Sequence, residues 1–531
     1  MSQHFRPHMM ESGISSIEEA IAKTDLSKSP GVPFSSTYST KGEVFEKDPN
    51  FITFLEEDWN LLAKDENYTF IGTVSLKEEI RPRDKIQRNS IRTFVGFPLD
   101  ATIHGGRLYG PMNQAFYDSH LATASAVGIN PISTDWDNLI TKLMRHPNAY
   151  ALDESEYDSS LFASLMWAIA KFRWTCYSSE YQTDENFSRH LQYYRNIVCT
   201  VMAGPDGVLV MKKTGNPSGS PNRIVDNTLA LFILLAFAWI RNCPPDMRTY
   251  TSFMSNVALA LVGDDNTWSV SDLAHVFYNF HTVSAAFADL GLTATTTHEK
   301  ARRADQCDFL SALTIKMDKG LSTAYVPVYD VEKLFTSLQY CSKKRASPTH
   351  TLERLTGMLN INWQCHEFRR FARHLLQWMR KKHHSYLQYD PDWNNVLGSF
   401  QDDQVYRQRL LSAPQPVVYT QAVEYLLPHS LWGEQEGTTP HKNIESYMHA
   451  SNTNKRRKAP TSPKRKAPAP KAPPPKTAPR DTPAAARHDL RYGELLRQLR
   501  SGVAKEQASR KGPPNRQLGR GRGAPVQGVP K

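Results

Sequence analysis

Residues 257–270 read VALALVGDDNTWSV, and this stretch decides the fold. Two runs of residues that favour β-strands flank Gly263, Asp264, Asp265 and Asn266. Glycine and asparagine beside paired acids, between two strands, are typical of a hairpin turn, which would hold both carboxylates at its tip. Alone, the Gly-Asp-Asp triplet is weak evidence, because it arises by chance in roughly one chain in ten of this length. Its meaning depends on the motifs around it.

Two such motifs precede the hairpin. Residues 150–161 read YALDESEYDSSL, in which Asp153 follows a short apolar run and Asp158 comes five residues later, ahead of an apolar segment with helical character. Residues 213–222 read KTGNPSGSPN and lead into RIVDNTLALFILL. Each has an ordinary alternative: a helix cap at Asp158 or Ser159, and a simple loop before a buried helix. Three motifs in this order are far less expected by chance than any one of them.

The composition indicates a mostly globular chain. It has 531 residues, 40% of them apolar, with 10 Trp, 22 Tyr and 23 Phe, which argues against wholesale disorder, collagen-like repeats and coiled coil. The longest apolar run, residues 228–240, has 13 residues, short of the roughly 20 that a membrane-spanning helix needs. We therefore expect a buried core helix there and no transmembrane segment. Six scattered cysteines without a C-x-x-C pair indicate a reducing compartment.

The net charge of +11 is divided unevenly along the chain. Residues 454–531 contain 21 Lys and Arg against 4 Asp and Glu, and 13 of the 34 prolines, so they carry +17 while residues 1–453 carry −6. A segment with this composition cannot bury enough apolar surface to offset its conformational entropy. It is predicted to be a disordered basic tail. Its open roles are RNA tethering, nuclear import through its basic clusters, and contact with an anionic membrane.

A helix is predicted shortly before this tail. Its apolar residues recur at helical spacing on one face, and the other face is rich in Arg and Lys. The face consists of Phe368, Phe371, Ala372, Leu375 and Met379. The pattern is typical of a surface helix with an apolar stripe toward the core, and a helix that also contacts nucleic acid is the alternative.

Together, these motifs resemble the RNA-dependent RNA polymerases of positive-strand RNA viruses, in the picornavirus-like supergroup and especially its potyvirus- and astrovirus-like branches. The resemblance extends over about residues 27–315, and the phrases DSSL, VDNTL and QAFYDSHL are particularly potyvirus-like. The stretches that resemble the family's motifs G, F, A, B, C, D and E are, in chain order, residues 27–34, 77–94, 153–161, 215–229, 263–265, 291–300 and 309–311.

The resemblance implies an α+β fold of the right-hand type, with fingers, an antiparallel palm sheet and a thumb. The implied domains are an N-terminal segment with fingers (1–134), a palm with inserted fingers elements (135–330), a helical thumb (331–450) and the disordered tail rich in Pro, Lys and Arg (451–531). Only 26 residues precede the motif G-like stretch. This favours either a minimal N-terminus or a product of a longer polyprotein or frameshift fusion.

The implied chemistry is nucleotidyl transfer. Two divalent ions about 4 Å apart can activate the attacking hydroxyl and stabilise the leaving pyrophosphate, and Mg²⁺ takes oxygen ligands. By resemblance, Asp153 and Asp264 bridge Mg²⁺ or Mn²⁺, and Asp265 is a third, weaker ligand. Lys300 would protonate the leaving pyrophosphate as a general acid, with His298 as the adjacent alternative.

The resemblance also assigns residues to substrate recognition. The residues assigned to ribose selection are Asp158, Ser218, Gly219 and Asn227. Arg223 stands at a position that is commonly Thr in the family, which leaves the detailed hydrogen-bond network open. The residues assigned to the triphosphate are Lys77, Arg81, Lys85 and Arg92, and those assigned to the template are Ser29, Pro30 and Gly31. Arg92 is the foremost candidate for direct phosphate contact; Ser90 stands where relatives often have Lys, and Arg88 is the candidate replacement.

Two other classes compete with template-directed RNA synthesis in viral replication and transcription. A reverse transcriptase would share the palm carboxylates, but Asp158 and Asn227 fit ribonucleotide selection. A structural or packaging RNA-binding protein would explain the basic tail and leave seven ordered motifs as coincidence. The expected partners are template RNA, nascent RNA, NTPs and other viral replication proteins. The expected location is the host cytoplasm, at membrane-associated replication complexes, with nuclear import through the tail as the alternative.

Overall fold

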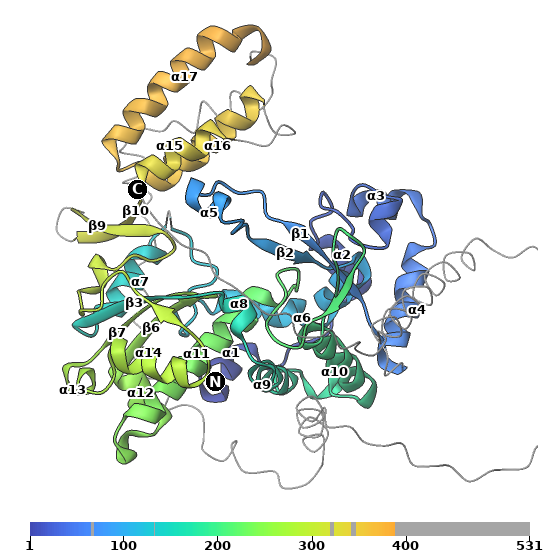
Figure 1. Ribbon diagram of the computed structural model, residues 1–531, viewed down its shortest axis with the longest axis horizontal. Coiled ribbons are helices and arrows are strands. Elements are labelled where there is room, and N and C mark those ends of the chain that lie inside the picture. The colour runs from blue at the N-terminus through green and yellow to red at the C-terminus, as the bar shows by residue number, and fades with distance from the viewer. Residues whose placement is uncertain (65–67, 132, 319–322, 341–346, 388–531) are drawn as a thin grey trace, which may run out of the picture. The chain divides into compact units, whose positions relative to one another are not determined.

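The structure is a computed structural model, shown in Figure 1, that describes residues 1–64, 68–131, 133–318, 323–340 and 347–387. The described residues combine helices with three sheets, which confirms the α+β class. The predicted tail, and the predicted thumb beyond residue 387, lie outside the described residues.

The quoted stretch forms the first two strands, one edge strand and its inner neighbour, of a four-stranded sheet with the strand order β6, β7, β3, β8. These strands are β6 (Val257–Val262), β7 (Asp265–Val270), β3 (Asn148–Glu154) and β8 (Ala294–Thr295). Every neighbouring pair is antiparallel, as predicted for the palm sheet, and β6 and β7 form the predicted hairpin.

Helices cover both faces of this sheet. They are α7 (Asp135–Leu143), α11 (Arg223–Asn242) and α14 (Phe280–Asp289), which Figure 1 shows around the strands. Successive side chains of a strand point to opposite faces. Leu259 and Leu261 accordingly join the core that includes α11 and α14, whereas Ala258 and Ala260 join the core that includes α7. Burial on both faces holds the hairpin in a fixed position.

The helix α11 contains the apolar run that the sequence analysis places in the core. By length and composition it is the one helix of the described residues that could cross a membrane. However, 67% of its most apolar window is buried inside the protein. Leu229, Leu231 and Leu235 are fully buried there. The burial agrees with the predicted core helix.

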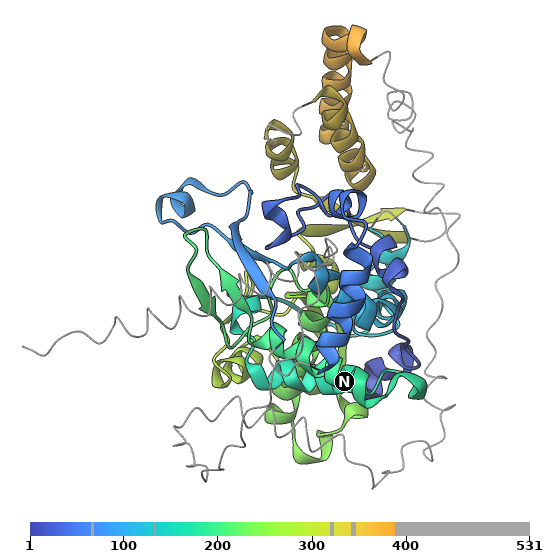
Figure 2. The same ribbon diagram turned by 90° about the vertical axis from the view of Figure 1, so that its right-hand side faces the viewer.

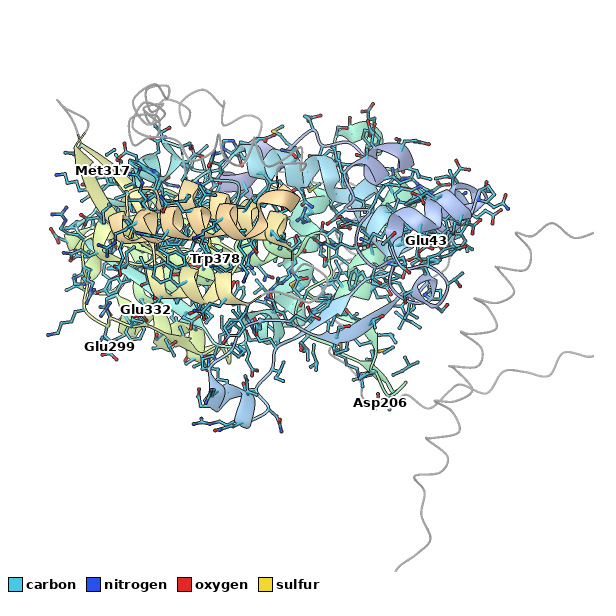
Figure 3. All side chains as sticks on the ribbon, turned by 90° about the horizontal axis from the view of Figure 1, so that it is seen from above. Glu43, Asp206, Glu299, Met317, Glu332 and Trp378 are labelled. Carbon is cyan, nitrogen blue, oxygen red and sulfur yellow. The ribbon has the colours of Figure 1, made fainter. Side chains whose placement is uncertain are left out.

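A second sheet has the strand order β2, β1, β4, β5. Its strands are β2 (Thr93–Gly96), β1 (Ile71–Leu76), β4 (Val201–Ala203) and β5 (Leu209–Met211). The two hairpins, blue and green in Figure 2, lie side by side because β1 pairs in parallel with β4. Asp206 lies at the tip of the β4–β5 hairpin (Figure 3). The sheet therefore joins the predicted fingers to a segment inserted within the predicted palm range.

The described C-terminal part consists of a strand pair followed by helices. These elements are β9 (Ala312–Asp318), β10 (Thr323–Tyr329), α15 (Val331–Gln339), α16 (Pro348–Asn362) and α17 (His366–Leu387). The Asn362 amide donates to the Tyr329 carbonyl (3.2 Å) and its oxygen accepts from the Tyr329 N–H (2.9 Å), which attaches α16 to β10. In Figure 2, α17 (orange) packs along α16.

The apolar stripe predicted for α17 faces its neighbours. Phe368, Ala372 and Met379 are buried. Phe371 is 37% exposed, yet its ring centroid lies 4.5 Å from that of Phe335 on α15. Contact of this helix with nucleic acid stays a prediction.

The remaining helices surround the two larger sheets. The α-helices are α1 (Ser2–Met9), α2 (Ile17–Ala22), α3 (Lys41–Lys47), α4 (Phe51–Lys64), α5 (Arg83–Gln87), α6 (Leu99–Asp118), α8 (Tyr157–Ser160), α9 (Ala163–Trp174), α10 (Asp184–Val198), α12 (Tyr250–Asn256) and α13 (Asp272–His275). Short 3₁₀ turns lie at Phe34–Ser36, Ser179–Tyr181, Pro245–Met247 and Ala304–Gln306. A buried ion pair, 2.7 Å between Arg173 Nε and Asp226, joins α9 to α11. Asp226, in the VDNTL phrase, therefore stabilises the packing of these two helices.

Candidate active site

The turn between β6 and β7 places Asp264 at its tip. Val262 pairs with Asp265 across the hairpin, so Gly263 and Asp264 form a two-residue turn. Gly263 has φ of +66°, which residues with a Cβ rarely adopt, and glycine is favoured at the first position of such a turn. The Gly263 N–H donates a 2.9 Å hydrogen bond to the Thr228 hydroxyl on α11. The turn is therefore tied to that helix.

Asp153 lies near the C-terminal end of β3, beside this turn. Leu152 pairs with Asn266 in β7, and continuing the antiparallel register by one residue sets Asp153 against Asp265. Asp153 and Asp264 are exposed, and Asp265 is partly buried. The three carboxylates predicted as metal ligands thus lie at one edge of the sheet, on adjacent strand ends.

The carboxylates affect one another's protonation. Burial raises the pKa of Asp265 to about 6; the Leu310 N–H opposes this rise, and the charge of Asp264 adds to it. Burial also raises the pKa of Glu154, and the charges of Asp264 and Asp153 add to that rise. Like charges gathered in this way favour a cation that neutralises them.

The donor set suits a hard divalent cation without enclosing one. In the described part of the chain, no group of three acidic, histidine or cysteine side chains is arranged to hold an ion. Mg²⁺ commonly binds through one or two carboxylates together with waters and substrate phosphates. Asp153 and Asp264, both exposed at the same sheet edge, fit that pattern.

Sequence reasoning missed Asn266 and Glu154. The Asn266 amide donates to the carbonyl oxygens of Leu152 (3.1 Å) and Asp264 (3.0 Å), and its oxygen accepts from the Leu152 N–H (3.4 Å). The same amide lies 3.3 Å from each carboxylate oxygen of the buried Glu154. Asn266 therefore links the end of β3 to the turn. The available signal was an acid at an inward position of β3, where strand alternation favours an apolar side chain.

The structure brings together part of the predicted sugar-recognition set. Asp158 lies on α8, and its carboxylate accepts a 2.6 Å hydrogen bond from the Asn227 amide on α11. The Asn227 oxygen accepts from the Asn216 amide (2.9 Å), a residue that the prediction omitted. Ser218 contributes no hydrogen bond to this network among the described residues. The helix-cap alternative is wrong, because α9 begins only at Ala163 and without a side-chain cap.

Arg223 pairs with the same carboxylate. Its Nε lies 3.0 Å and 3.2 Å from the two Asp158 oxygens, and its Nη2 also donates to Asp158. The pair is partly buried, with 43% of the Arg223 side chain and 30% of the Asp158 side chain exposed. Arg223, at the position that is commonly Thr in the family, therefore forms an ion pair with Asp158.

Two glycine loops approach the end of β2. A Cβ at Gly219 would overlap a carbonyl oxygen of β2 and lie 2.7 Å from the Phe97 nitrogen, and one at Gly31 would lie 2.7 Å from the Phe97 carbonyl oxygen. Gly31 also has φ of +72°. Beside it, Ser29 is exposed and Pro30 is buried. The motif G-like and motif B-like stretches therefore both contact the backbone that follows the motif F-like stretch.

Glu79 partly neutralises the basic residues that are predicted to contact the triphosphate. Glu79 accepts from Arg92 Nε (2.8 Å) and lies 3.1 Å from Arg81 Nε. The hydrogen bond from Arg92 lowers the pKa of Glu79. Lys77 and Lys85 are exposed. Direct phosphate contact by Arg92 stays a prediction, and Glu79 is the group with which a phosphate would compete.

Lys300 lies in an exposed loop that begins beside Asp153. Thr295 of β8 pairs with Asp153, and the Thr296 hydroxyl donates to a carbonyl of β3 (2.7 Å). Glu299, the residue before Lys300, lies at the surface in Figure 3. The role of Lys300 as general acid stays a prediction.

Comparison with known proteins defines the class. The family model of viral RNA-dependent RNA polymerases matches residues 7–380, a longer range than the motifs alone cover. The chain therefore belongs to the viral RNA-dependent RNA polymerase family. The resemblance to this family inferred from the motifs is confirmed.

Individual relatives are plant virus polyproteins. The chain is 29% identical over 310 residues to the genome polyprotein of Watermelon mosaic virus II (isolate USA), and 31% identical over 307 residues to that of Turnip mosaic virus (strain Japanese). These matches cover 58% and 56% of this chain, but only 29% and 9% of the respective polyproteins. Among solved structures, the Sicinivirus 3Dpol RNA-dependent RNA polymerase matches with a TM-score of 0.56 at 18% identity, covering 77% of this chain and 80% of that one. This structural match supports the right-hand polymerase fold.

Proposed function

We propose that this chain synthesises RNA on an RNA template by two-metal nucleotidyl transfer, for viral genome replication and transcription. The observation that carries the proposal is the convergence of Asp153, Asp264 and Asp265 at one sheet edge. Mg²⁺ or Mn²⁺, when bound there, would activate the attacking 3′-hydroxyl and stabilise the leaving pyrophosphate.

Within this proposal, the side chains of the hairpin position the reacting groups. Asp153 and Asp264 are the principal metal ligands, and Asp265 is the weaker third. Asn266 holds the two strand ends in register through its hydrogen bonds to Leu152 and Asp264. Lys300 gives a proton to the pyrophosphate oxygen as the bond to the α-phosphorus breaks.

The surrounding residues select and orient the substrates. The Asp158–Asn227 pair lies at the sugar of the incoming nucleotide, with Ser218 and Gly219 in the loop beside it. The triphosphate meets Lys77, Arg81, Lys85 and Arg92. The template passes Ser29, Pro30 and Gly31.

The proposal extends to partners and location. Template RNA, nascent RNA and NTPs are the substrates, and other viral replication proteins assemble with the enzyme at membrane-associated complexes in the host cytoplasm. Residues 454–531 tether RNA through their +17 charge, or direct nuclear import. Removing residues 454–531 should weaken RNA binding at low salt and preserve catalysis. An inactive truncated chain would contradict this assignment.

The central test is nucleotide incorporation on a homopolymeric RNA template, with and without primer. Asp264→Ala should abolish extension while RNA binding is retained. Asp246→Ala, at an exposed carboxylate of the 3₁₀ turn Pro245–Met247, is the matched control and should remain active. Near-normal extension by Asp264→Ala would refute the assignment. Extension with dNTPs in preference to NTPs would favour a reverse transcriptase instead.

A further inference from the structure

The two residues expected to read the ribose already have partners in this structure. The Asp158 carboxylate accepts from Asn227 and from Arg223, so both of its oxygens are engaged. The Asn227 amide donates to Asp158, and its oxygen accepts from Asn216. Each Asp158 oxygen already accepts two hydrogen bonds, so an incoming 2′-hydroxyl would have to displace a donor to reach this carboxylate.

Arg223 has donors left over. A guanidinium carries five N–H donors and no acceptor. The Asp158 pair uses Nε and Nη2, and no described hydrogen bond uses Nη1. The side chain is 43% exposed. It is thus a fixed and accessible donor beside a carboxylate that holds its orientation.

Arg223 also lies close to the reacting centre. Its neighbour Ile224 approaches the catalytic turn, because a Cβ at Gly263 would lie 3.1 Å from Ile224 Cδ1. On the other side, Tyr157 lies next to Asp158 in sequence, and its buried hydroxyl donates to the Asn227 carbonyl (2.9 Å). The ion pair is therefore part of the sugar network, and the residue after Arg223 contacts the hairpin turn.

We propose that Arg223 reads the sugar of the incoming nucleotide by donating a hydrogen bond to the 2′-oxygen, and that Asp158 serves to hold the guanidinium in place. This inference rests on the sugar-selection site proposed above and changes its chemistry. A carboxylate can only accept a hydrogen bond from the 2′-hydroxyl, whereas a guanidinium can only donate to it. The two arrangements therefore require opposite roles of the same hydroxyl.

The test uses nucleotides that differ only at the 2′ position. A 2′-fluoro group accepts a hydrogen bond weakly and cannot donate one, and 2′-deoxy sugar does neither. Incorporation efficiency, kcat/KM, is measured for NTP, 2′-fluoro-NTP and dNTP on one primed template with the full chain. If Arg223 donates, the wild-type enzyme should use 2′-fluoro-NTP about tenfold better than dNTP.

The matched variants separate recognition from folding. Arg223→Met should reduce the ratio of 2′-fluoro-NTP to dNTP efficiency to about one, because methionine has no N–H or O–H donor. This ratio is independent of the fraction of folded enzyme. Arg241→Met removes a comparable ion pair, with Asp289, at the other end of α11 and should leave the ratio unchanged.

Two results would refute the inference, and a third would refute the proposed function on which it rests. Equal use of 2′-fluoro-NTP and dNTP by the wild-type enzyme would show that no donor contacts the 2′ position. An unchanged ratio in Arg223→Met, with all three efficiencies lowered together, would show that Arg223 only supports the site. Both results refute the inference. A wild-type enzyme that incorporates none of the three would refute the proposed function itself.

Discussion

The Gly263 N–H and the Thr228 hydroxyl are 2.9 Å apart and form a hydrogen bond between the hairpin turn and α11. The same hydroxyl donates to the Ile224 carbonyl (2.7 Å). Thr228 follows Asn227, which bonds Asp158. One turn of α11 therefore fixes both the hairpin that carries Asp264 and Asp265 and the hydrogen-bond network around Asp158.

Replacing Thr228 with valine should impair both stability and activity. Valine has the same shape but leaves the buried Gly263 N–H without its acceptor, which costs about 1–3 kcal/mol. The melting temperature and the rate of NTP incorporation should both fall. Thr228→Ser keeps the hydroxyl and should retain most of the activity. Equal behaviour of the two variants would show that the hydrogen bond is unimportant.

Gly219→Ala should be strongly disruptive. The new Cβ would lie 2.7 Å from the Phe97 nitrogen and would also overlap a carbonyl oxygen of β2, and neither backbone atom can move without displacing the strand. The measurement is template binding and extension, both of which should be lost. Gly357→Ala on α16 meets nothing within 4 Å and should stabilise the helix by about 0.5–1 kcal/mol. A benign Gly219→Ala would contradict the close approach.

Asn266→Asp should lower kcat, and it should also lower the melting temperature, because it places a second carboxylate in a buried position beside Glu154. The substituted oxygen would face the carbonyls of Leu152 and Asp264 and the carboxylate of Glu154, so the two strand ends would separate. Displacement of catalytic groups by about 1 Å can reduce the rate about 100-fold.

The control for this variant is Asn242→Asp. The Asn242 amide likewise donates to two carbonyls, of Ala238 (2.8 Å) and Thr282 (3.1 Å), but at the far end of α11. It should cost stability without a specific loss of kcat. A similar kcat for both variants, at matched melting temperature, would argue against the positioning role of Asn266.

The stability of the fold should decrease between mildly acidic and mildly alkaline pH because of Asp100. Burial raises the pKa of Asp100 from 3.8 to about 8, and the charge of Asp58 adds to the rise. Between these two values the folded chain binds a proton that the unfolded chain has released. Folding is therefore favoured at low pH and loses about 1.4 kcal/mol per pH unit as pH rises through this window.

Asp100→Asn removes this dependence, because an amide does not ionise, and its oxygen can still accept from the Ala101 N–H as in the wild type (2.7 Å). Melting temperatures measured at pH 6, 7 and 8.5 should therefore decline less in the variant. Asp246→Asn, at an exposed site, should follow the wild-type curve. Parallel curves for wild type and Asp100→Asn would contradict the assignment.

Much of the site followed from local patterns. The hairpin at Gly263 and the α11 core helix depend on strand-compatible runs, a glycine turn and an apolar run, all within neighbouring residues. The contact between Asn266 and Glu154 could not be predicted in this way. Glu154 is an acid at a position of β3 where the alternation favours an apolar residue, and its partner Asn266 lies on another strand, β7. Asn216 also did not follow, because its hydrogen bond to Asn227 depends on how the loop before α11 folds back onto that helix.

The sequence by itself determined the class of the protein, the order of its motifs and the hairpin that carries Asp264, because turn geometry and strand periodicity are encoded in a few consecutive residues. Only the tertiary structure decided which charges neutralise one another. Arg223 and Asp158 are 65 residues apart, and their pairing depends on how α8 packs against α11. Likewise, Arg92 donates a hydrogen bond to Glu79, because the pairing of β1 with β2 brings the two residues together. Ion pairs of this kind form wherever packing brings opposite charges within a few ångströms, a distance that no local sequence pattern specifies.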